Sequence, residues 1–389
     1  MIQSILDNDL YKFTMQQAVH MLYPRAHAEY VFINRSDTRF PRGFARKLRR
    51  EVAAMAGLRL LPEEKAFLET ACYFLTPVYL DFLEHYTFDP GEVSIRETGG
   101  ELKVTISGPW YRTILWEVPL LALISELFFI MTHARPITET QRTSINIHKA
   151  RVLSDNAIRF ADFGTRRRFS FQSHKAMIHD ILQTGNSTLI GTSNVHLARL
   201  FNIKPIGTLA HEWFMFHAVL NGYRMANRTA VDAWVTVFQG DLGIALTDTF
   251  TTSVFLKSFD TVHAKLFDGV RHDSGDPYRF VDAITAHYKK LRIDPMTKTI
   301  VFSDGLDIDR AVAIHNYCLG KIRDSYGIGT NLTNDVGVIP LNMVIKMSRC
   351  RTAPDKAWHP AVKLSDDPGK HTGVKKELKH CMAVLERSF

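Results

Sequence analysis

The chain has 389 residues, of which 46% are hydrophobic, 23% charged and 11% aromatic, so a predominantly disordered protein is excluded. A net charge of +8 permits an anionic partner but does not require a nucleic acid, because phosphorylated small molecules satisfy it equally well. The length predicts two domains, unless one of them is a barrel.

The first part of the chain, residues 1–125, has an irregular pattern. Its first ten residues, MIQSILDNDL, carry acids and no basic segment before an apolar run, so we expect no secretory signal. Residues 44–55 have a helical pattern. Residues 118–131 are apolar but contain Glu126 and are shorter than the ~20 residues of a membrane span, so we expect a buried helix and no membrane partner.

From about residue 150 to 340 the sequence alternates between short β-branched or aromatic runs, small polar turns and amphipathic helical patterns. Seven such turns are present, at residues 163–165, 190–192, 206–208, 247–248, 273–276, 303–305 and 328–330. Seven strand–helix units with polar residues after every strand predict an α/β barrel, complete or incomplete, whose site lies at the carboxyl ends of its strands.

The tail, residues 341–389, is rich in Lys and Pro, and we expect it to return to the N-terminal region. The predicted organisation is therefore a smaller α+β domain of residues 1–125, completed by 341–389, and a barrel domain of residues 126–340. The four cysteines lie far apart without a CxxC pair, which favours a reducing cytoplasm over a disulfide framework or a structural zinc site.

Several turns are suited to binding phosphate. Gly-Thr pairs recur at four predicted strand ends, where backbone N–H groups and hydroxyls can donate, although one such pair alone is an ordinary turn. Three consecutive arginines, Arg166 to Arg168, follow one strand and cannot all face the same way. We expect at least one to enter the site, the alternative being a solvated basic turn.

Other strand ends carry candidate cations, carboxylates and a histidine. Arg271 can bind phosphate, and Asp273 can hold Mg²⁺ through water, whereas Asp276 before Pro277 is expected to cap a helix. The last two strand ends offer hydroxyls and backbone amides for a terminal phosphate, at Ser303, Gly305, Gly327, Gly329 and Thr330. His211 opens a helix after Gly207-Thr208, as a functional residue or as an ordinary hydrogen-bonding one.

A protein of another class, one that binds RNA, is the main alternative from the residues alone. The segment between Arg39 and Arg50 is strongly basic and contains Phe40 and Phe44, as phosphate contacts and base stacking would need. A solvated helix face explains the same segment, and no RNA-recognition or KH signature accompanies it.

Blocks in the same order over nearly the whole chain resemble the bacterial type of nicotinate phosphoribosyltransferase. They are residues 7–12 (DNDLYK), 107–110 (SGPW), 162–168 (DFGTRRR), 191–194 (GTSN), 207–213 (GTLAHEW), 272–277 (HDSGDP), 327–330 (GIGT) and 362–366 (VKLSD). The resemblance implies an irregular type II phosphoribosyltransferase barrel with a smaller domain built from both chain ends. It also implies a homodimer with shared sites.

The resemblance implies that nicotinate, phosphoribosyl pyrophosphate and ATP react to give nicotinate mononucleotide, in NAD biosynthesis. Tyr11 of a neighbouring subunit and Phe163 are implied to stack on the base, and Thr208 and Arg271 to hold its carboxylate. For phosphoribosyl pyrophosphate we expect charge stabilisation by Arg166, His211, Arg271 and Mg²⁺ near Asp273. The ribose 5-phosphate is expected on Gly305, Gly329 and Thr330.

Two features refine this expectation. Ser193 occupies the place where the related nicotinamide enzymes carry an aspartate, so an amide-selective site is the alternative within the fold, and we expect nicotinate to be preferred. The sequence contains no GxxxxGK[ST] motif, so ATP is expected at the phosphoribosyl pyrophosphate site. The resemblance implies that His211 is transiently phosphorylated there.

Overall fold

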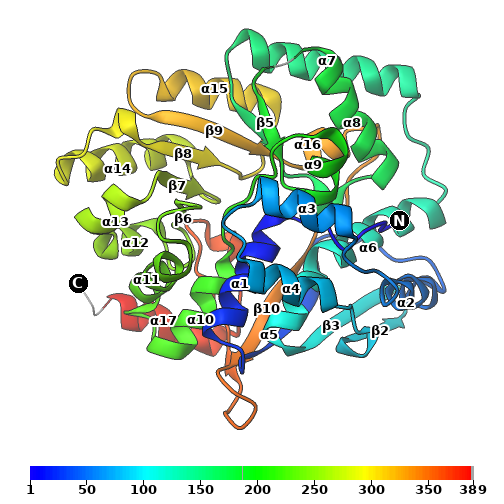
Figure 1. The fold of residues 1–389 in the computed structure, drawn as a ribbon, viewed down its shortest axis with the longest axis horizontal. Coiled ribbons are helices and arrows are strands. Elements are labelled where there is room, and N and C mark those ends of the chain that lie inside the picture. Colours follow the sequence, from blue (N-terminus) through cyan, green and yellow to red (C-terminus); the bar gives the residue numbers. More distant parts are fainter. Residues whose placement is uncertain (186, 387–389) are drawn as a thin grey trace.

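Two sheets organise the chain. The computed structural model describes residues 1–185 and 187–386, and it contains a six-stranded parallel sheet and a five-stranded antiparallel sheet (Figure 1). Helix α1 (Leu10–Leu22) runs through the middle of the view, between the parallel strands and the antiparallel ones. This is the predicted α/β class.

The antiparallel sheet combines both ends of the chain. Its strand order is β11-β10-β1-β3-β2, and its strands are β1 (His27–Asn34), β2 (Val93–Thr98), β3 (Glu101–Pro109), β10 (Met343–Arg351) and β11 (His359–Pro360). Strand β10 pairs with β1 along its whole length and buries Met343, Ile345 and Met347 on one face, the period-two pattern of a half-buried strand. The tail therefore returns to the N-terminal region. The domain boundaries at residues 125 and 340 remain a prediction.

The parallel sheet has the order β5-β4-β9-β8-β7-β6 and is an open barrel, not a closed one. Its strands are β4 (Phe160–Asp162), β5 (Leu189–Thr192), β6 (Ile244–Leu246), β7 (Gly269–His272), β8 (Thr299–Phe302) and β9 (Arg323–Ile328). Six of the seven predicted turns lie at the carboxyl ends of these strands: four follow a strand, residues 328–330 begin at the last residue of β9, and residues 190–192 form the end of β5 itself.

The seventh predicted strand, before Gly207, is absent from the described part of the chain, so that prediction was wrong. An isolated bridge from Thr192 to Pro205 occurs there, with bonds from Thr192 N to Lys204 O and from Ile206 N to Thr192 O. Proline cannot donate to a ladder, and beyond Thr192 the chain pairs with the N-terminal segment instead, through a bridge from Asp9 to Asn194 and the bond from Leu10 N to Ser193 O.

Helices cover both sheets. Besides α1 they are α2 (Phe44–Met55), α3 (Pro62–Ala71), α4 (Pro77–His85), α5 (Trp110–Thr113), α6 (Glu117–Met131), α7 (Glu139–Asp155), α8 (Phe171–Gln183), α9 (Val195–Phe201), α10 (His211–Asn221), α11 (Ala226–Phe238), α12 (Thr252–Ser258), α13 (Thr261–Leu266), α14 (Pro277–Lys290), α15 (Ile308–Cys318), α16 (Thr330–Thr333) and α17 (Lys375–Glu386). The helix predicted over residues 44–55 is confirmed as α2, and Asp276 caps α14 as expected.

Helix α6 is the predicted buried helix. One stretch, Trp110–Met131, is long and apolar enough to cross a membrane by length and composition, but 78% of its most apolar window lies inside the protein. The interior of a large protein contains such helices. The four cysteines are free, in agreement with their wide spacing, and they are buried.

The basic segment between Arg39 and Arg50 does not offer its aromatic rings to a ligand. Phe40 and Phe44 are buried and pack together, with ring centroids 4.8 Å apart. Stacking of RNA bases on these rings is therefore excluded, and the amphipathic pattern of α2 accounts for the segment, with its apolar side inside and its basic side in solvent.

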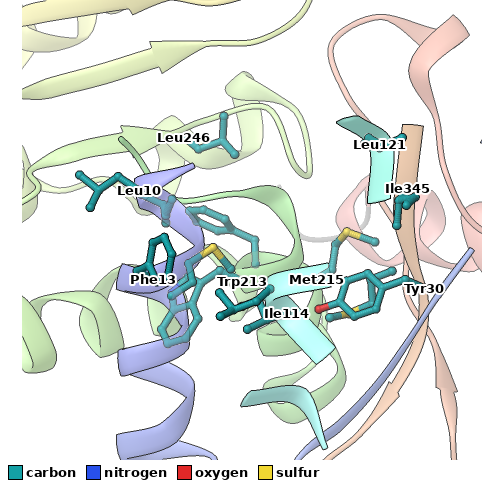
Figure 2. Close-up of a cluster of buried hydrophobic side chains, with 14 of the residues drawn as sticks. Leu10, Phe13, Tyr30, Ile114, Leu121, Trp213, Met215, Leu246 and Ile345 are labelled. Carbon is teal, nitrogen blue, oxygen red and sulfur yellow. The ribbon is translucent and has the colours of Figure 1, made fainter. Parts of the chain in front are cut away.

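The core joins the two sheets through α1 and α10. Figure 2 shows how side chains from distant segments meet there, namely Leu10, Phe13, Tyr30, Ile114, Leu121, Trp213, Met215, Leu246 and Ile345. These residues come from both sheets and from the helices between them. The two sheets therefore share one hydrophobic core, which fixes their relative position.

A buried ion pair attaches the N-terminal segment to the barrel. Arg168 donates from Nη1 and Nη2 to the two carboxylate oxygens of Asp7, both at 2.7 Å, and both side chains are fully buried. Asn194 Nδ2 donates to the same carboxylate at 2.7 Å. Together the three residues hold the segment that carries Asp9 and Tyr11 against β4 and β5.

We expect the Arg168→Met substitution to lower the free energy of unfolding by about 3–5 kcal/mol, because it leaves the Asp7 carboxylate buried without its cation. Urea denaturation followed by circular dichroism measures this. Arg25→Met is the matched control, since Arg25 pairs with Asp355 on the surface and both side chains are more than half exposed. Equal effects of the two substitutions would contradict the assignment.

Candidate active site

A cavity of about 900 Å³ opens at the carboxyl ends of the parallel strands, and β10 of the antiparallel sheet forms part of its wall. It brings together every residue that the sequence predicted for the site: Tyr11, Phe163, Arg166, Ser193, Thr208, His211, Arg271, Asp273, Ser303, Gly305, Gly327, Gly329 and Thr330. Their individual roles remain predictions.

Two aromatic residues line the cavity from opposite parts of the sequence. Tyr11 comes from α1, and Phe163 follows β4. The Phe163 ring lies so close to Gly327 that a Cβ atom there would be 2.4 Å from it, so this position requires glycine. The structure describes a single chain, in which Tyr11 and Phe163 line the same cavity, so the expectation that Tyr11 reaches the site of a neighbouring subunit stays a prediction. The buried Asp7–Arg168 pair attaches the segment before α1 to the barrel of the same chain.

Ser193 has an acidic neighbour that the sequence did not suggest. Its hydroxyl donates to Asp9 Oδ1 at 2.7 Å, and Asp9 is 3% exposed. Burial raises the pKa of Asp9, although the nearby Arg166 opposes the rise. The hydroxyl of Ser193 thus donates to Asp9 in this structure, and the role of Ser193 in the preference for nicotinate stays a prediction.

Arg271 and Thr208 form the expected pair at another part of the cavity wall. Arg271 Nη1 donates to the Thr208 hydroxyl, while the buried Nε of Arg271 has no hydrogen-bond partner among the described residues. Arg271 also faces Asp273. Burial alone would raise the pKa of Asp273, but the charge of Arg271 and the hydrogen bond of His211 hold this pKa well below its usual range. A guanidinium with unpaired N–H donors can bind a carboxylate or phosphate ligand.

His211 is the first residue of α10 and is almost fully buried. Its Nε2 lies 2.9 Å from Asp273 Oδ2 and 2.9 Å from Lys363 Nζ, and its Nδ1 lies 3.0 Å from Thr249 Oγ1. Burial and the Lys363 ammonium lower the pKa of His211 to about 4, so the ring is neutral at pH 7. A neutral imidazole has one unprotonated nitrogen and is a competent nucleophile.

The three consecutive arginines have separate positions. Arg166 and Arg167 line the cavity, whereas Arg168 points away from it into the pair with Asp7. Arg166 Nη1 lies 3.6 Å from Glu117, longer than a hydrogen bond, so its donors stay available to a ligand.

His211, Asp248 and Asp273 are close enough to be considered as a metal site, with ligand atoms within 4.8 Å of one another. The Lys363 ammonium already contacts this group, 2.9 Å from His211 Nε2 and 3.2 Å from Asp248 Oδ2. A second cation directly among the three ligands would be repelled. Binding of magnesium through water at Asp273 stays a prediction.

Sequence reasoning missed several residues of the cavity and its surroundings. Asp248 follows β6 in the same way that the predicted site residues follow their strands, so its position in the sequence could have identified it as a candidate site residue. Lys363 and Lys346 come from the tail, and Asp9 from the N-terminal segment, so only the tertiary structure places them here.

Comparisons with known proteins agree with this geometry. Residues 158–387 match the model of the nicotinate phosphoribosyltransferase (NAPRTase) family, and residues 6–125 match that of its N-terminal domain. The chain belongs to this family. A nicotinate phosphoribosyltransferase of Desulforapulum autotrophicum is 72% identical over the full length of both chains.

Solved structures of the NAPRTase family have the same fold. The enzyme from Porphyromonas gingivalis superposes with a TM-score of 0.97 at 44% identity, over 99% of this chain and 100% of that one. The enzyme from Vibrio cholerae gives 0.92 at 36% identity, over 100% and 93%. The two family models together cover both sheets and all the lining residues predicted from sequence.

If Tyr11 completes the site of a neighbouring subunit, as the resemblance implies, we expect mixed Tyr11→Ala and Arg271→Ala proteins to recover some activity. A mixed dimer would then contain one site in which both residues are intact. The test denatures the two variants together, renatures them and assays the activity of the family. Activity no greater than the sum of the separate variants, in demonstrably mixed dimers, would show that each site is built from a single chain.

Proposed function

We propose that this cavity transfers the 5-phosphoribosyl group of phosphoribosyl pyrophosphate to the ring nitrogen of nicotinate, releasing pyrophosphate, with hydrolysis of ATP. One observation carries the proposal: a single cavity in a member of the NAPRTase family holds two aromatic side chains, the Arg271–Thr208 pair and a neutral buried histidine. The proposed reaction needs these side chains in one cavity, because the base, phosphoribosyl pyrophosphate and ATP all bind there.

The aromatic residues and Arg271 act on the base. The pyridine nitrogen is itself the nucleophile, so the protein has to orient the ring and needs no general base. Stacking between Tyr11 and Phe163 fixes the ring plane and contributes about 0.5–1.5 kcal/mol beyond area burial. Arg271 and Thr208 hold the carboxylate and thereby fix the rotation of the ring in that plane.

The cations of the cavity act on the leaving group. As the bond to pyrophosphate breaks, negative charge grows on the departing oxygens and positive charge on the ribose. Arg166 and Arg271 donate to the departing oxygens, and the strand-end amides of Gly305 and Gly329 hold the 5-phosphate. Magnesium, bound through water at Asp273, would supply further charge neutralisation.

The histidine links ATP to the reaction. His211 Nε2 lies on the cavity side next to Asp273, while Nδ1 faces Thr249 and Asp248. ATP placed with its triphosphate in the same cavity would present its γ-phosphorus to Nε2. Transient phosphorylation adds negative charge beside Arg166 and Arg271, which changes how the cavity binds the next polyphosphate.

The metabolic role, the cellular location and the oligomeric state are also proposals. Nicotinate mononucleotide is a precursor of NAD, so the activity belongs to NAD biosynthesis in the cytoplasm. A homodimer is proposed from the resemblance to other members of the family. In that homodimer the sites are shared, with Tyr11 of one subunit stacking on the base bound by the other.

Nicotinamide is the second candidate substrate, because Asp9 favours it. A carboxylate beside Ser193 can accept a hydrogen bond from an amide and would repel the carboxylate of nicotinate if it were ionised. The raised pKa of Asp9 and the adjacent Arg166 reduce this repulsion, which supports nicotinate.

We expect the unmodified protein to prefer nicotinate, and Ser193→Asp to reduce this preference by about 100-fold, because a second carboxylate beside the base costs several kcal/mol for an anionic substrate. Pyrophosphate release with nicotinate and with nicotinamide, each with and without ATP, measures it. Ser193→Asn is the control of similar size without the charge. Equal turnover of nicotinate and nicotinamide by the unmodified protein would contradict the proposed preference.

We expect ATP to leave an acid-labile, base-stable phosphoryl group on His211. The His211→Asn protein should lose the label and ATP hydrolysis while keeping slow, uncoupled synthesis of nicotinate mononucleotide, because the base-binding residues are untouched. Incubation with γ-labelled ATP followed by peptide mapping tests this. A label that persists in His211→Asn would place the acceptor elsewhere.

A further inference from the structure

Lys363 reaches the active site from the tail, outside the strand-end loops of the barrel. It lies between β11 and α17 in sequence, and its side chain is 5% exposed. Its Nζ lies 2.9 Å from His211 Nε2 and 3.2 Å from Asp248 Oδ2. A lysine buried this deeply against a histidine nitrogen loses solvation and side-chain entropy, so its position needs specific support.

The surrounding tail segment, residues 361–366, provides that support. Leu364 N donates to Thr249 O at 2.8 Å, and Thr252 donates from both its amide and its hydroxyl to the Asp366 carboxylate. Ser365, which has a φ of +64°, donates to the Ser274 hydroxyl at 2.8 Å. The segment is thus fastened to the loops after β6 and β7, the loops that carry Asp248 and Asp273.

The contacts of His211 Nε2 restrict where its proton can be. To bond Asp273, Nε2 must carry the proton and donate; to bond Lys363, it must be unprotonated and accept. The neutral ring cannot do both. With Lys363 as donor, the proton lies on Nδ1 and is given to the Thr249 hydroxyl at 3.0 Å, next to the carboxylate of Asp248 at 3.8 Å. This is the arrangement in which Nε2 can act as a nucleophile.

We propose that Lys363 is a catalytic residue of phosphoryl transfer, which keeps Nε2 of His211 unprotonated and then pairs with the phosphoryl oxygens as they arrive. The inference rests on the proposed phosphorylation of His211 and adds the residue that prepares and stabilises it. Nearby Lys346 lines the cavity as well, but the described contacts place Lys363 on the reacting nitrogen itself.

Atoms and electrons are conserved in the proposed phosphoryl transfer from ATP to His211. The Nε2 lone pair attacks the γ-phosphorus of ATP and forms the N–P bond, while the bond from phosphorus to the β,γ-bridging oxygen breaks. The electron pair of that bond leaves with ADP, and the imidazole proton stays on Nδ1. The ammonium of Lys363 moves from Nε2 to a phosphoryl oxygen, where a charge-assisted hydrogen bond is stronger than the one it gives up.

The experiment compares Lys363→Met, Lys363→Arg and the unmodified protein, using γ-labelled ATP and selective ¹⁵N labelling of histidine. We expect the initial rate of label uptake in Lys363→Met to fall by about 100-fold, as when a preorganised donor is removed. Lys363→Arg should recover much of that loss. The ¹⁵N spectrum of His211, assigned with His211→Asn, should show the proton on Nδ1 in the unmodified protein and on Nε2 in Lys363→Met.

Lys356→Met is the matched control, because Lys356 is an exposed lysine of the same tail and should change neither the label nor the spectrum. A folded Lys363→Met protein that is labelled at the unmodified rate, or an unchanged tautomer, would overturn the inference. So would an unmodified protein that takes up no label. Nicotinate-dependent release of pyrophosphate, measured on the same unmodified sample, tests the proposed base transfer separately.

Discussion

The active site depends on the buried pair between Asp7 and Arg168. An isolated buried charge costs several kcal/mol, so each of the two groups requires the other, and neither segment can leave without exposing an uncompensated charge. Asn194 completes the arrangement by donating to the same carboxylate. Through these three residues the first segment of the chain is attached to the barrel, and Tyr11, which follows in α1, lines the same cavity as Phe163 and Ser193.

The sequence predicted those parts of the site whose chemistry is local. A polar turn after a short strand is recognisable from neighbouring residues, so Phe163, Asp273 and Gly329 could be placed at strand ends before the structure was known. The strand expected before Gly207 failed for the opposite reason. Residues 204–206 do bond to Thr192, but the next two residues, Ser193 and Asn194, pair with the N-terminal segment, and such pairing between distant segments leaves no local signal.

The surroundings of Ser193 and Tyr11 could not be predicted for a related reason. The role of Ser193 was inferred from its type, whereas its hydroxyl donates to Asp9, 184 positions away. The attachment of the segment before Tyr11 to the barrel depends on Asp7, which pairs with Arg168 at a distance of 161 positions. Lys363 was inside a recognised block, but the block alone gave no partner for it. Tertiary contacts assign partners, and these contacts join residues too far apart to be paired from sequence.

The charges around the cavity explain how its cations stay available for phosphate. Lys12 is fully buried between two acids, 2.6 Å from Glu117 and 2.5 Å from Glu212. Lys12 contacts Oε2 of Glu117, and Arg166 lies 3.6 Å from Oε1 of the same acid, attracted but without a short bond. An arginine in a short bidentate pair, as Arg168 is, would have to break that pair before it could bind a ligand. Arg166 lines the cavity and has no such pair to break, so of these two arginines it is the one whose donors can turn to a ligand.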